Sequence, residues 1–335
     1  MKIAVYTICK NEAQFVNRWI TSCKDADVIL VTDTGSTDTT IPDLLNLKSI
    51  YPQIEVNSIK ISPWRFDDAR NYSLLSLPQW VDVCICLDMD EILLEGWREK
   101  VEKAYQDNTL DRLRYNYIWS WNEDGSAGIT YYADKIHRRF GYRWVNPVHE
   151  TLAKDTRLSA EVQAFIPDTL IEHHPDNTKS RGYYLDLLAL STRENPLNDR
   201  NAHYYARDLM FAGKYEQAVR EFTRHLNLPT ALWKPERSAS YRYMGDCYWA
   251  LGKVSFAIAS FKLAIAEAPL EREPYIALAQ AYRVTKNWEG VVENCMKALA
   301  IVEKPNTYIC QPSAWSDWPD QMLNEARTNL GECYA

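Results

Sequence analysis

The chain has 335 residues, enough for two domains of ordinary size, and its 46% hydrophobic and 25% charged residues are a normal globular mix. A net charge of −7 argues against nucleic-acid or anionic-membrane partners. No apolar run approaches the roughly 20 residues of a membrane span, so we expect none. The eight cysteines lack paired CxxC spacing, and the first residues enter a strand at once without a signal peptide. We therefore expect reduced thiols and a cytoplasmic protein.

The first half of the chain alternates predicted strands with predicted helices. Strands are expected over residues 2–9, 27–31, 56–61 and 81–87, with helices opening near residues 10–12 and at residue 66. Polar turns follow three of the strands, at residues 7–12, 33–38 and 88–91. This alternation predicts a doubly wound, mostly parallel sheet, in which these turns share the carboxyl edge where ligands bind.

The run from residue 81 to 87 is apolar and ends abruptly in the acids Asp88, Asp90 and Glu91. Carboxylates cannot be buried unpaired at small cost, so we expect this end to face water or a cation. Asp88 and Asp90 are two residues apart and point the same way on an extended chain. That arrangement suits Mg²⁺ or Mn²⁺, which prefer oxygen ligands and often bind substrate phosphates as well. An acidic loop after a core strand is the simpler alternative.

The other turns can be interpreted in the same way. Asp33 can accept hydrogen bonds from a base or ribose, and Thr7 and Cys9 offer backbone groups at the end of the first strand. Arg70 is a fixed cation that can fork onto phosphate oxygens. Together these groups predict a nucleoside-diphosphate site with a metal. Neither GxGxxG nor a Walker A loop follows the first strand, which excludes the common dinucleotide and P-loop sites.

Four of these segments resemble motifs of the family 2 glycosyltransferases, which have the GT-A fold. The segments are Thr7–Glu12, Val31–Asp38, Ala69–Asn71 and Leu87–Glu91, and the resemblance covers residues 3 to about 180. It implies a metal-dependent hexosyltransferase with a nucleotide-sugar donor, a UDP-sugar being favoured. Thr34 stands where many members have a second Asp, which weakens any assignment of the nucleotide.

The resemblance also implies roles for individual residues. Asp33 would contact the base, Arg70 the diphosphate, and the DXD motif of Asp88 and Asp90 would bind Mn²⁺ or Mg²⁺. The first motif, with Thr7, Cys9 and Glu12, would belong to the donor site.

Residues 112–180 are expected to form the acceptor side. A hairpin is predicted from strands at residues 113–121 and 129–133, joined by a turn-rich link. The following segment, Lys135–Glu150, resembles a subset of the family in which an Arg-rich strand, a Trp and a His-Glu pair recur. An inverting enzyme needs a carboxylate that deprotonates the acceptor, and we predict Glu150 for this role. The alternatives are a helix N-terminal acid or a partner of an arginine; His149 would orient substrate or pack.

His173 and His174 follow another predicted strand. Many GT-A transferases carry a late histidine that completes the metal shell, and a neutral imidazole is a reasonable ligand beside carboxylates. Alternation along the strand places only one of the two on the site face. We prefer His173 as the ligand, with His174 as the second candidate.

The second half resembles tetratricopeptide repeats with a period of about 34 residues. We divide the chain into a transferase domain (1–180), a linker helix (181–198) and a repeat array (199–335). One repeat carries the expected small and aromatic residues at Gly245, Tyr248, Ala257, Phe261, Ala264 and Pro269. An insertion at residues 303–318 precedes a last helix from residue 324. The array should bind a polypeptide, a protein partner or a second copy, or it should simply stabilise the protein.

The combined prediction is a metal-dependent, inverting glycosyltransferase acting on a saccharide or polypeptide acceptor. The main alternative is a catalytically degenerate transferase domain that serves as a repeat-based adaptor. A sugar nucleotidyltransferase shares the α/β plan, but it would need a Gly-rich basic loop after the first strand, and residues 10–12 do not provide one. The donor sugar, the acceptor and the oligomeric state stay open.

Overall fold

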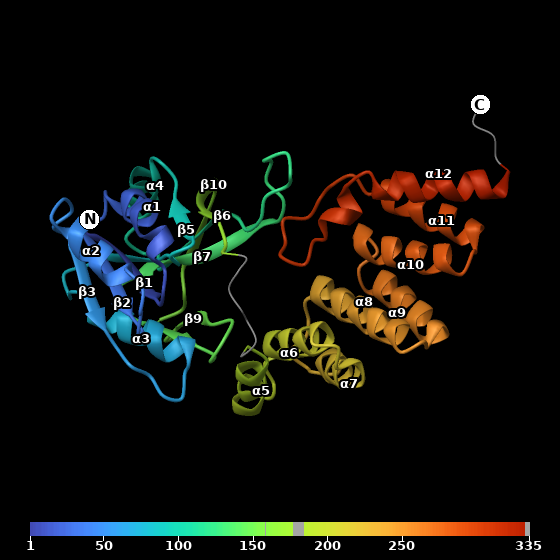
Figure 1. The fold of residues 1–335 in the computed structure, drawn as a ribbon, viewed down its shortest axis with the longest axis horizontal. Coiled ribbons are helices and arrows are strands. Elements are labelled where there is room, and N and C mark those ends of the chain that lie inside the picture. The colour runs from blue at the N-terminus through green and yellow to red at the C-terminus, as the bar shows by residue number, and fades with distance from the viewer. Residues whose placement is uncertain (158, 177–183, 332–335) are drawn as a thin grey trace. The chain divides into compact units, whose positions relative to one another are not determined.

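The structure is a computed structural model and describes residues 1–157, 159–176 and 184–331. The chain divides into two compact units, Met1–Arg181 and Gly182–Ala335. The first is an α/β unit built on one large sheet, and the second is entirely helical (Figure 1). The predicted fold class, a mostly parallel α/β domain followed by an all-α array, is confirmed. Among the described helices, none has the length and apolar character that a membrane crossing requires.

The described residues of the first unit form ten strands and four helices. In chain order they are β1 (Ile3–Cys9), α1 (Ala13–Cys23), β2 (Val28–Asp33), α2 (Thr40–Lys48), β3 (Ile54–Ser58), α3 (Phe66–Ser76), β4 (Val83–Cys86), β5 (Glu91–Leu93), α4 (Trp97–Ala104), β6 (Arg112–Ile118), β7 (Thr130–Arg138), β8 (Tyr142–Val145), β9 (Thr151–Lys154) and β10 (Gln163–His173). Eight strands form one sheet in the order β3-β2-β1-β4-β7-β6-β10-β5, and β8 pairs with β9 separately.

The half of the sheet formed by β3, β2, β1 and β4 is parallel, as the strand–helix alternation predicts. Its central strands are buried on both faces, so they read as continuous apolar runs. Successive residues of β1 face opposite layers: Val5 joins the cluster that contains Trp19 of α1, whereas Tyr6 joins the cluster that contains Leu74 of α3. The parallel order brings the carboxyl ends of β1, β2 and β4 to one edge.

Beyond β4 the sheet becomes mixed. β7 runs antiparallel to both β4 and β6, so the predicted hairpin is present, although β7 extends to Arg138. The prediction that Glu91 lies in an open polar turn is wrong, because Glu91 begins β5, pairs with His173 on β10, and is only 1% exposed. The strand expected at residues 56–61 lies at Ile54–Ser58.

The second unit is a row of helices. They are α5 (Tyr184–Glu194), α6 (Asp199–Phe211), α7 (Tyr215–Leu226), α8 (Lys234–Ala250), α9 (Val254–Glu267), α10 (Arg272–Val284), α11 (Trp288–Leu299) and α12 (Trp318–Leu330), with a 3₁₀ turn at Pro312–Trp315. Successive helices pack as hairpins, α6 on α7, α8 on α9 and α10 on α11 (Figure 1). The predicted last helix begins six residues earlier than expected and ends before Gly331, whose φ of 76° closes it. Tyr183 and Tyr334, which belong to the predicted linker and last helix, lie outside the described residues.

The two helices of a hairpin approach closely where one of them carries a glycine, because glycine has no Cβ atom. A Cβ atom on Gly245 of α8 would lie 2.5 Å from the ring of Phe261 on α9, and one on Gly290 of α11 would lie 2.5 Å from the ring of Tyr282 on α10. Both positions therefore require glycine, which explains why small residues recur at the crossing points that the repeat pattern identifies.

A buried polar chain joins the first two hairpins to the segment before the 3₁₀ turn. Ser240 Oγ lies 2.7 Å from His203 Nδ1 and 2.9 Å from His225 Nδ1. His225 Nε2 lies 3.4 Å from Glu236, whose other oxygen accepts a hydrogen bond from the Tyr308 hydroxyl. Both histidines are fully buried. This set of hydrogen-bonded side chains therefore has the composition of a catalytic site but no access for a substrate. It is a structural network.

We expect the free energy of unfolding to decrease as the pH is lowered, because of His203. Burial, which outweighs the opposing charge of Glu236, lowers the pKa of His203 to about 3. An exposed histidine titrates near 6.5, so between these values the unfolded chain binds a proton that the folded chain does not, and acid favours unfolding. The loss from this one group is about 1.4 kcal/mol per pH unit below pH ~6. In urea unfolding between about pH 7 and pH 5.5, His203→Asn should show a shallower pH slope than wild type; an equal slope would contradict the assignment.

Candidate functional site

Arg70 on α3 joins the elements that meet at the carboxyl edge of the sheet. Its Nη2 donates to Asp88 Oδ1 over 2.6 Å, its Nε to Glu150 Oε1 over 2.5 Å, and its Nη1 lies 3.1 Å from Cys86 Sγ. The guanidinium carbon also lies 5.1 Å from the centre of the Trp144 ring. Arg70 is only 7% exposed, so it is a fixed cation with both of its edges used. The structure thus brings together Arg70, Asp88 and Glu150, three residues that are far apart in the sequence.

The neighbouring Asn71 fixes the segment that carries Glu150. Its amide accepts from the backbone N–H of Trp144 and donates to the carbonyl of Trp144, over 2.8 and 2.9 Å. Downstream, Asn146 and His149 have φ values of 79° and 49°, a left-handed conformation that is unusual for side chains of this size. The contacts of Asn71 on α3 and the turn that contains Asn146 and His149 together direct Glu150 toward Arg70.

Asp88 is neutralised from two sides. Lys135 of β7 donates to its second oxygen, Oδ2, over 2.9 Å, and also to Glu91 Oε1 over 2.9 Å. Burial alone would raise the pKa of Asp88, but Arg70 and Lys135 outweigh it and hold that pKa well below its usual range. Sequence reasoning missed Lys135 as a site residue. No sequence motif marked it, because its place depends on strand pairing: β7 lies next to β4 with Ile136 opposite Ile85, which puts Lys135 near the end of β4.

Asp90 faces His173 rather than Asp88. His173 Nε2 lies 3.2 Å from Asp90 Oδ2, while its Nδ1 lies 3.0 Å from the carbonyl oxygen of Trp119 and its ring stacks on the Trp119 ring at 4.3 Å. A carbonyl only accepts, so Nδ1 carries a proton, and in a neutral imidazole Nε2 is then a bare acceptor that faces a carboxylate. Two acceptors at this separation require a cation between them or a proton on Nε2.

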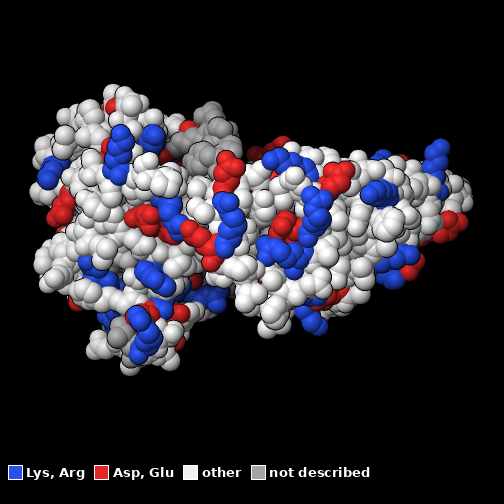
Figure 2. Space-filling view, turned by 90° about the horizontal axis from the view of Figure 1, so that it is seen from below, with Lys and Arg blue, Asp and Glu red and all other residues white. Residues whose placement is uncertain are grey.

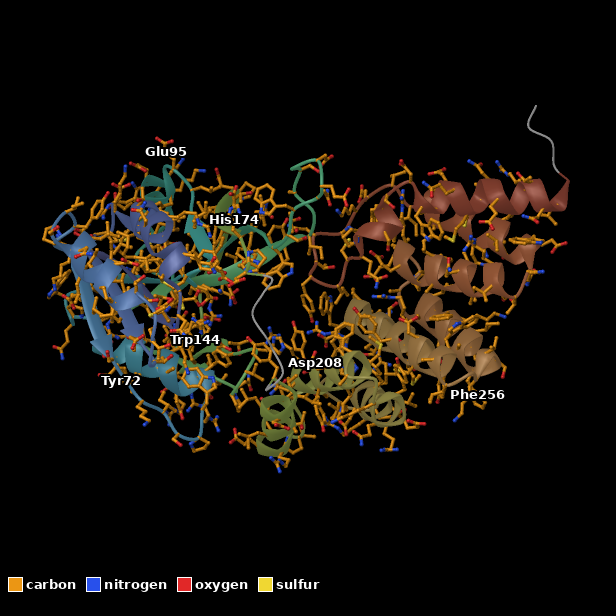
Figure 3. The ribbon with its side chains drawn as sticks, in the orientation of Figure 1. Tyr72, Glu95, Trp144, His174, Asp208 and Phe256 are labelled. Atoms are coloured by element: carbon orange, nitrogen blue, oxygen red, sulfur yellow. The ribbon has the colours of Figure 1, made fainter. Side chains whose placement is uncertain are left out.

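His174 is turned toward a different group. Its Nε2 lies 3.3 Å from Glu172, and its ring stacks on Trp121 at 5.6 Å between centres. Figure 3 labels His174 just beyond the end of β10. Of the two candidate histidines, His173 is therefore the one that the structure brings to Asp90.

The residues present fit a divalent cation at Asp90 and His173. The orientation of His173 by a backbone carbonyl is the usual support for a metal-binding histidine, and 3.2 Å is close to the ~3 Å between adjacent ligands of an octahedral Mg²⁺. The described part of the chain holds no group of three or more His, Cys, Asp or Glu side chains arranged around one ion. Substrate and water would have to complete the coordination. Each oxygen of Asp88 accepts from a cationic side chain, so in this arrangement Arg70 and Lys135 would compete with a metal for Asp88.

Thr7, Cys9 and Asp33, which belong to the first two motifs, are buried and contact other parts of the protein. Asp33 accepts hydrogen bonds from the backbone N–H groups of Gly35 and Ser36, both over 3.0 Å, and is 6% exposed. Thr7 is fully buried, and its carbonyl oxygen accepts from the Ser73 hydroxyl over 3.1 Å. Cys9 is also buried, its Sγ lies 3.9 Å from Asp33, and burial raises the pKa of its thiol far above the usual range.

Glu12 lies at the start of α1. Its backbone N–H donates to Thr40 Oγ1 over 2.8 Å, which ties the first turn of the helix to α2.

On the face drawn in Figure 2, acidic and basic side chains are interspersed over the surface.

Comparisons with known proteins leave the family open. No family model and no curated protein matches the sequence. Among solved structures, TarS of S. aureus matches with a TM-score of 0.39 at 12% identity, over 80% of this chain and 53% of TarS. MamA matches with a TM-score of 0.36 at 16% identity, over 44% of this chain and 77% of MamA. The Cut9–Hcn1 hetero-tetramer of the APC/C matches with a TM-score of 0.34 at 17% identity, over 42% and 26% of the two chains. Similarities this low decide nothing about function, which has to be argued from the site itself.

The contacts of Asp33 predict that it stabilises the fold. Asp33→Ala removes a carboxylate that accepts from two backbone N–H groups at the end of β2, and it should lower the free energy of unfolding by about 1–3 kcal/mol. Urea denaturation of the full chain measures this loss. A variant as stable as wild type would show that the carboxylate is held there for ligand binding alone.

Proposed function

We propose that the chain is a metal-dependent, inverting glycosyltransferase that uses a nucleotide-sugar donor. The observation that carries the proposal is the pairing of Asp90 with a carbonyl-oriented His173 beside the Arg70–Asp88 pair, at the carboxyl edge of the sheet. A cation-binding pair next to a fixed guanidinium is what the diphosphate of such a donor requires. The donor would be a UDP-sugar or another nucleoside-diphosphate sugar.

The reaction would be a single displacement at the anomeric carbon. The acceptor oxygen or sulfur forms a bond to that carbon while the bond from the carbon to the diphosphate oxygen breaks. The electron pair leaves with the diphosphate, and the acceptor proton passes to Glu150. Arg70 stabilises the negative charge that develops on the diphosphate. When bound, the metal supplies Lewis-acid stabilisation of the same leaving group.

The hydrogen bond between Arg70 and Glu150 has a consequence for this mechanism. While Arg70 donates to Glu150 Oε1, that oxygen is occupied and is not available to take a proton from an acceptor. We infer that the donor diphosphate, when it binds, competes with Glu150 for the N–H groups of the fixed guanidinium and so frees Glu150 for proton transfer. The acceptor would then be deprotonated only after the donor is in place, which limits wasteful donor hydrolysis.

The alternative is a degenerate transferase domain that acts as an adaptor through its helical repeats. The pairing of Arg70 with Glu150 favours it, because a carboxylate in that pair could serve structure alone. The helical unit suits a polypeptide acceptor, a protein partner or a second copy, since an array of hairpins presents an extended surface. Binding and slow hydrolysis of a nucleotide sugar would separate the two functions.

The metal assignment predicts that substitution of His173 lowers nucleotide release and that substitution of the adjacent His174 does not. Purified protein is incubated with UDP-, GDP-, dTDP- and CMP-sugars in Mn²⁺ or EDTA, and the nucleotide that is released is quantified. Asp90→Asn and His173→Gln should lower metal-dependent release at least ~100-fold. His174→Gln, the matched control, should stay near wild type because its ring faces Glu172 and Trp121. Equal loss in both histidine variants would contradict the assignment, and no release or binding with any donor would favour the adaptor.

The base assignment predicts a separate effect for Glu150→Gln. Donor hydrolysis, in which water is the acceptor, should slow by about 100- to 10,000-fold because the proton has no acceptor. Nucleotide binding, measured by calorimetry, should change little. Hydrolysis at the wild-type rate would show that Glu150 is a partner of Arg70 and nothing more.

A further inference from the structure

Lys135 occupies a place in the site that no motif assigns. Its ammonium group lies between Asp88 and Glu91, 2.9 Å from an oxygen of each. Resting on the proposed function, we propose that Lys135 is a second fixed cation for the diphosphate of the donor, placed on the opposite side of Asp88 from Arg70. It would stabilise the leaving group directly and would make part of that stabilisation independent of a metal.

Glu91 and Asp88 each accept hydrogen bonds from groups other than Lys135. Glu91 already accepts from the Tyr117 hydroxyl over 2.7 Å and from the backbone N–H of Asp88 over 2.8 Å. Asp88 already accepts from Arg70 over 2.6 Å. Because other donors already reach both carboxylates, the ammonium group of Lys135 is not committed to either of them alone.

Lys135 and Asp88 are the accessible side chains in the cluster that they form with Arg70 and Glu91. The side chains of Lys135 and Asp88 are 26% and 30% exposed, whereas those of Arg70 and Glu91 are 9% and 2% exposed. The lysine therefore lies on the open side of the cluster, where an entering anion arrives. An ammonium group has three N–H donors, and the described residues accept two hydrogen bonds from it. One donor is left for a phosphate oxygen.

Lys135 and a divalent metal would act at different carboxylates, Lys135 at Asp88 and the metal at Asp90. Asp88 has a cation on each oxygen, so a divalent ion is attracted to Asp90 and His173 instead. Asp88 then aligns Arg70 and Lys135, and the donor diphosphate meets two protein cations in addition to the metal. This arrangement predicts that a nucleoside diphosphate binds better than the monophosphate even when metal is removed.

The test measures binding rather than turnover. Calorimetry compares a nucleoside diphosphate with the monophosphate of the same base, each in Mn²⁺ and in EDTA, for wild type and Lys135→Gln. The variant should bind the diphosphate about 10- to 100-fold more weakly, as expected for the loss of one charged hydrogen bond. Its affinity for the monophosphate should fall by less than about 3-fold, and Lys135→Arg should recover much of the loss.

Lys154 of β9 provides the matched control. It is also a largely buried lysine paired with an aspartate, Asp111, but it lies away from the carboxyl edge. Lys154→Gln should leave the preference for the diphosphate unchanged. If Lys135→Gln fails to fold because Glu91 is left uncompensated, the double variant with Glu91→Gln removes both charges and should show the same loss of diphosphate preference.

The outcomes separate the two proposals. Nucleotide binding by wild type with an unchanged diphosphate preference in Lys135→Gln would overturn the role of Lys135 and leave the proposed function standing. Equal weakening for both nucleotides would also overturn it, because a general structural defect acts on both. No binding of any nucleotide by wild type would overturn the proposed function and this inference together.

Discussion

The candidate site depends on one buried guanidinium. Arg70 comes from a helix on one face of the sheet, Asp88 from the end of a central strand, and Glu150 from a turn that follows the separate β8 strand, and the ion pairs of Arg70 connect all three. Breaking a buried ion pair by removing one partner costs several kcal/mol, because the remaining charge keeps its desolvation penalty. The same residue that would hold the diphosphate therefore also holds the site together, and function and local stability are coupled through it.

The architecture of both units follows from patterns that are local in the sequence. The buried strands are continuous apolar runs, and the helical hairpins carry small residues where a Cβ atom would collide with an aromatic ring, as Gly245 does against Phe261. These patterns can be recognised in the sequence because burial and close packing constrain the residues of each element separately. For the same reason the predicted sheet edge, hairpin and helical array correspond to elements of the structure.

The details of the site could not be predicted from the same patterns, because they depend on contacts between distant segments. Glu91 looked like an open acid, but it begins an edge strand and is buried against Tyr117 and Lys135. Lys135 reaches Asp88 only because β7 pairs antiparallel with β4, a pairing that strand–helix alternation does not specify. Strand alternation predicts that only one of the two adjacent histidines faces the site. Which residue each histidine contacts could be found only from the structure.

The balance of charge explains why a metal and a diphosphate would bind this edge together. The cluster contains the four carboxylates of Asp88, Asp90, Glu91 and Glu150 against the two fixed cations of Arg70 and Lys135. Burial raises the pKa of Glu91, and the negative charge of Asp88 adds to this effect, which relieves part of the excess. The remaining excess would repel an approaching diphosphate. A divalent cation at Asp90 compensates for it, so the anionic donor is attracted more strongly once the cation is in place, while Arg70 and Lys135 supply the part of the attraction that needs no metal.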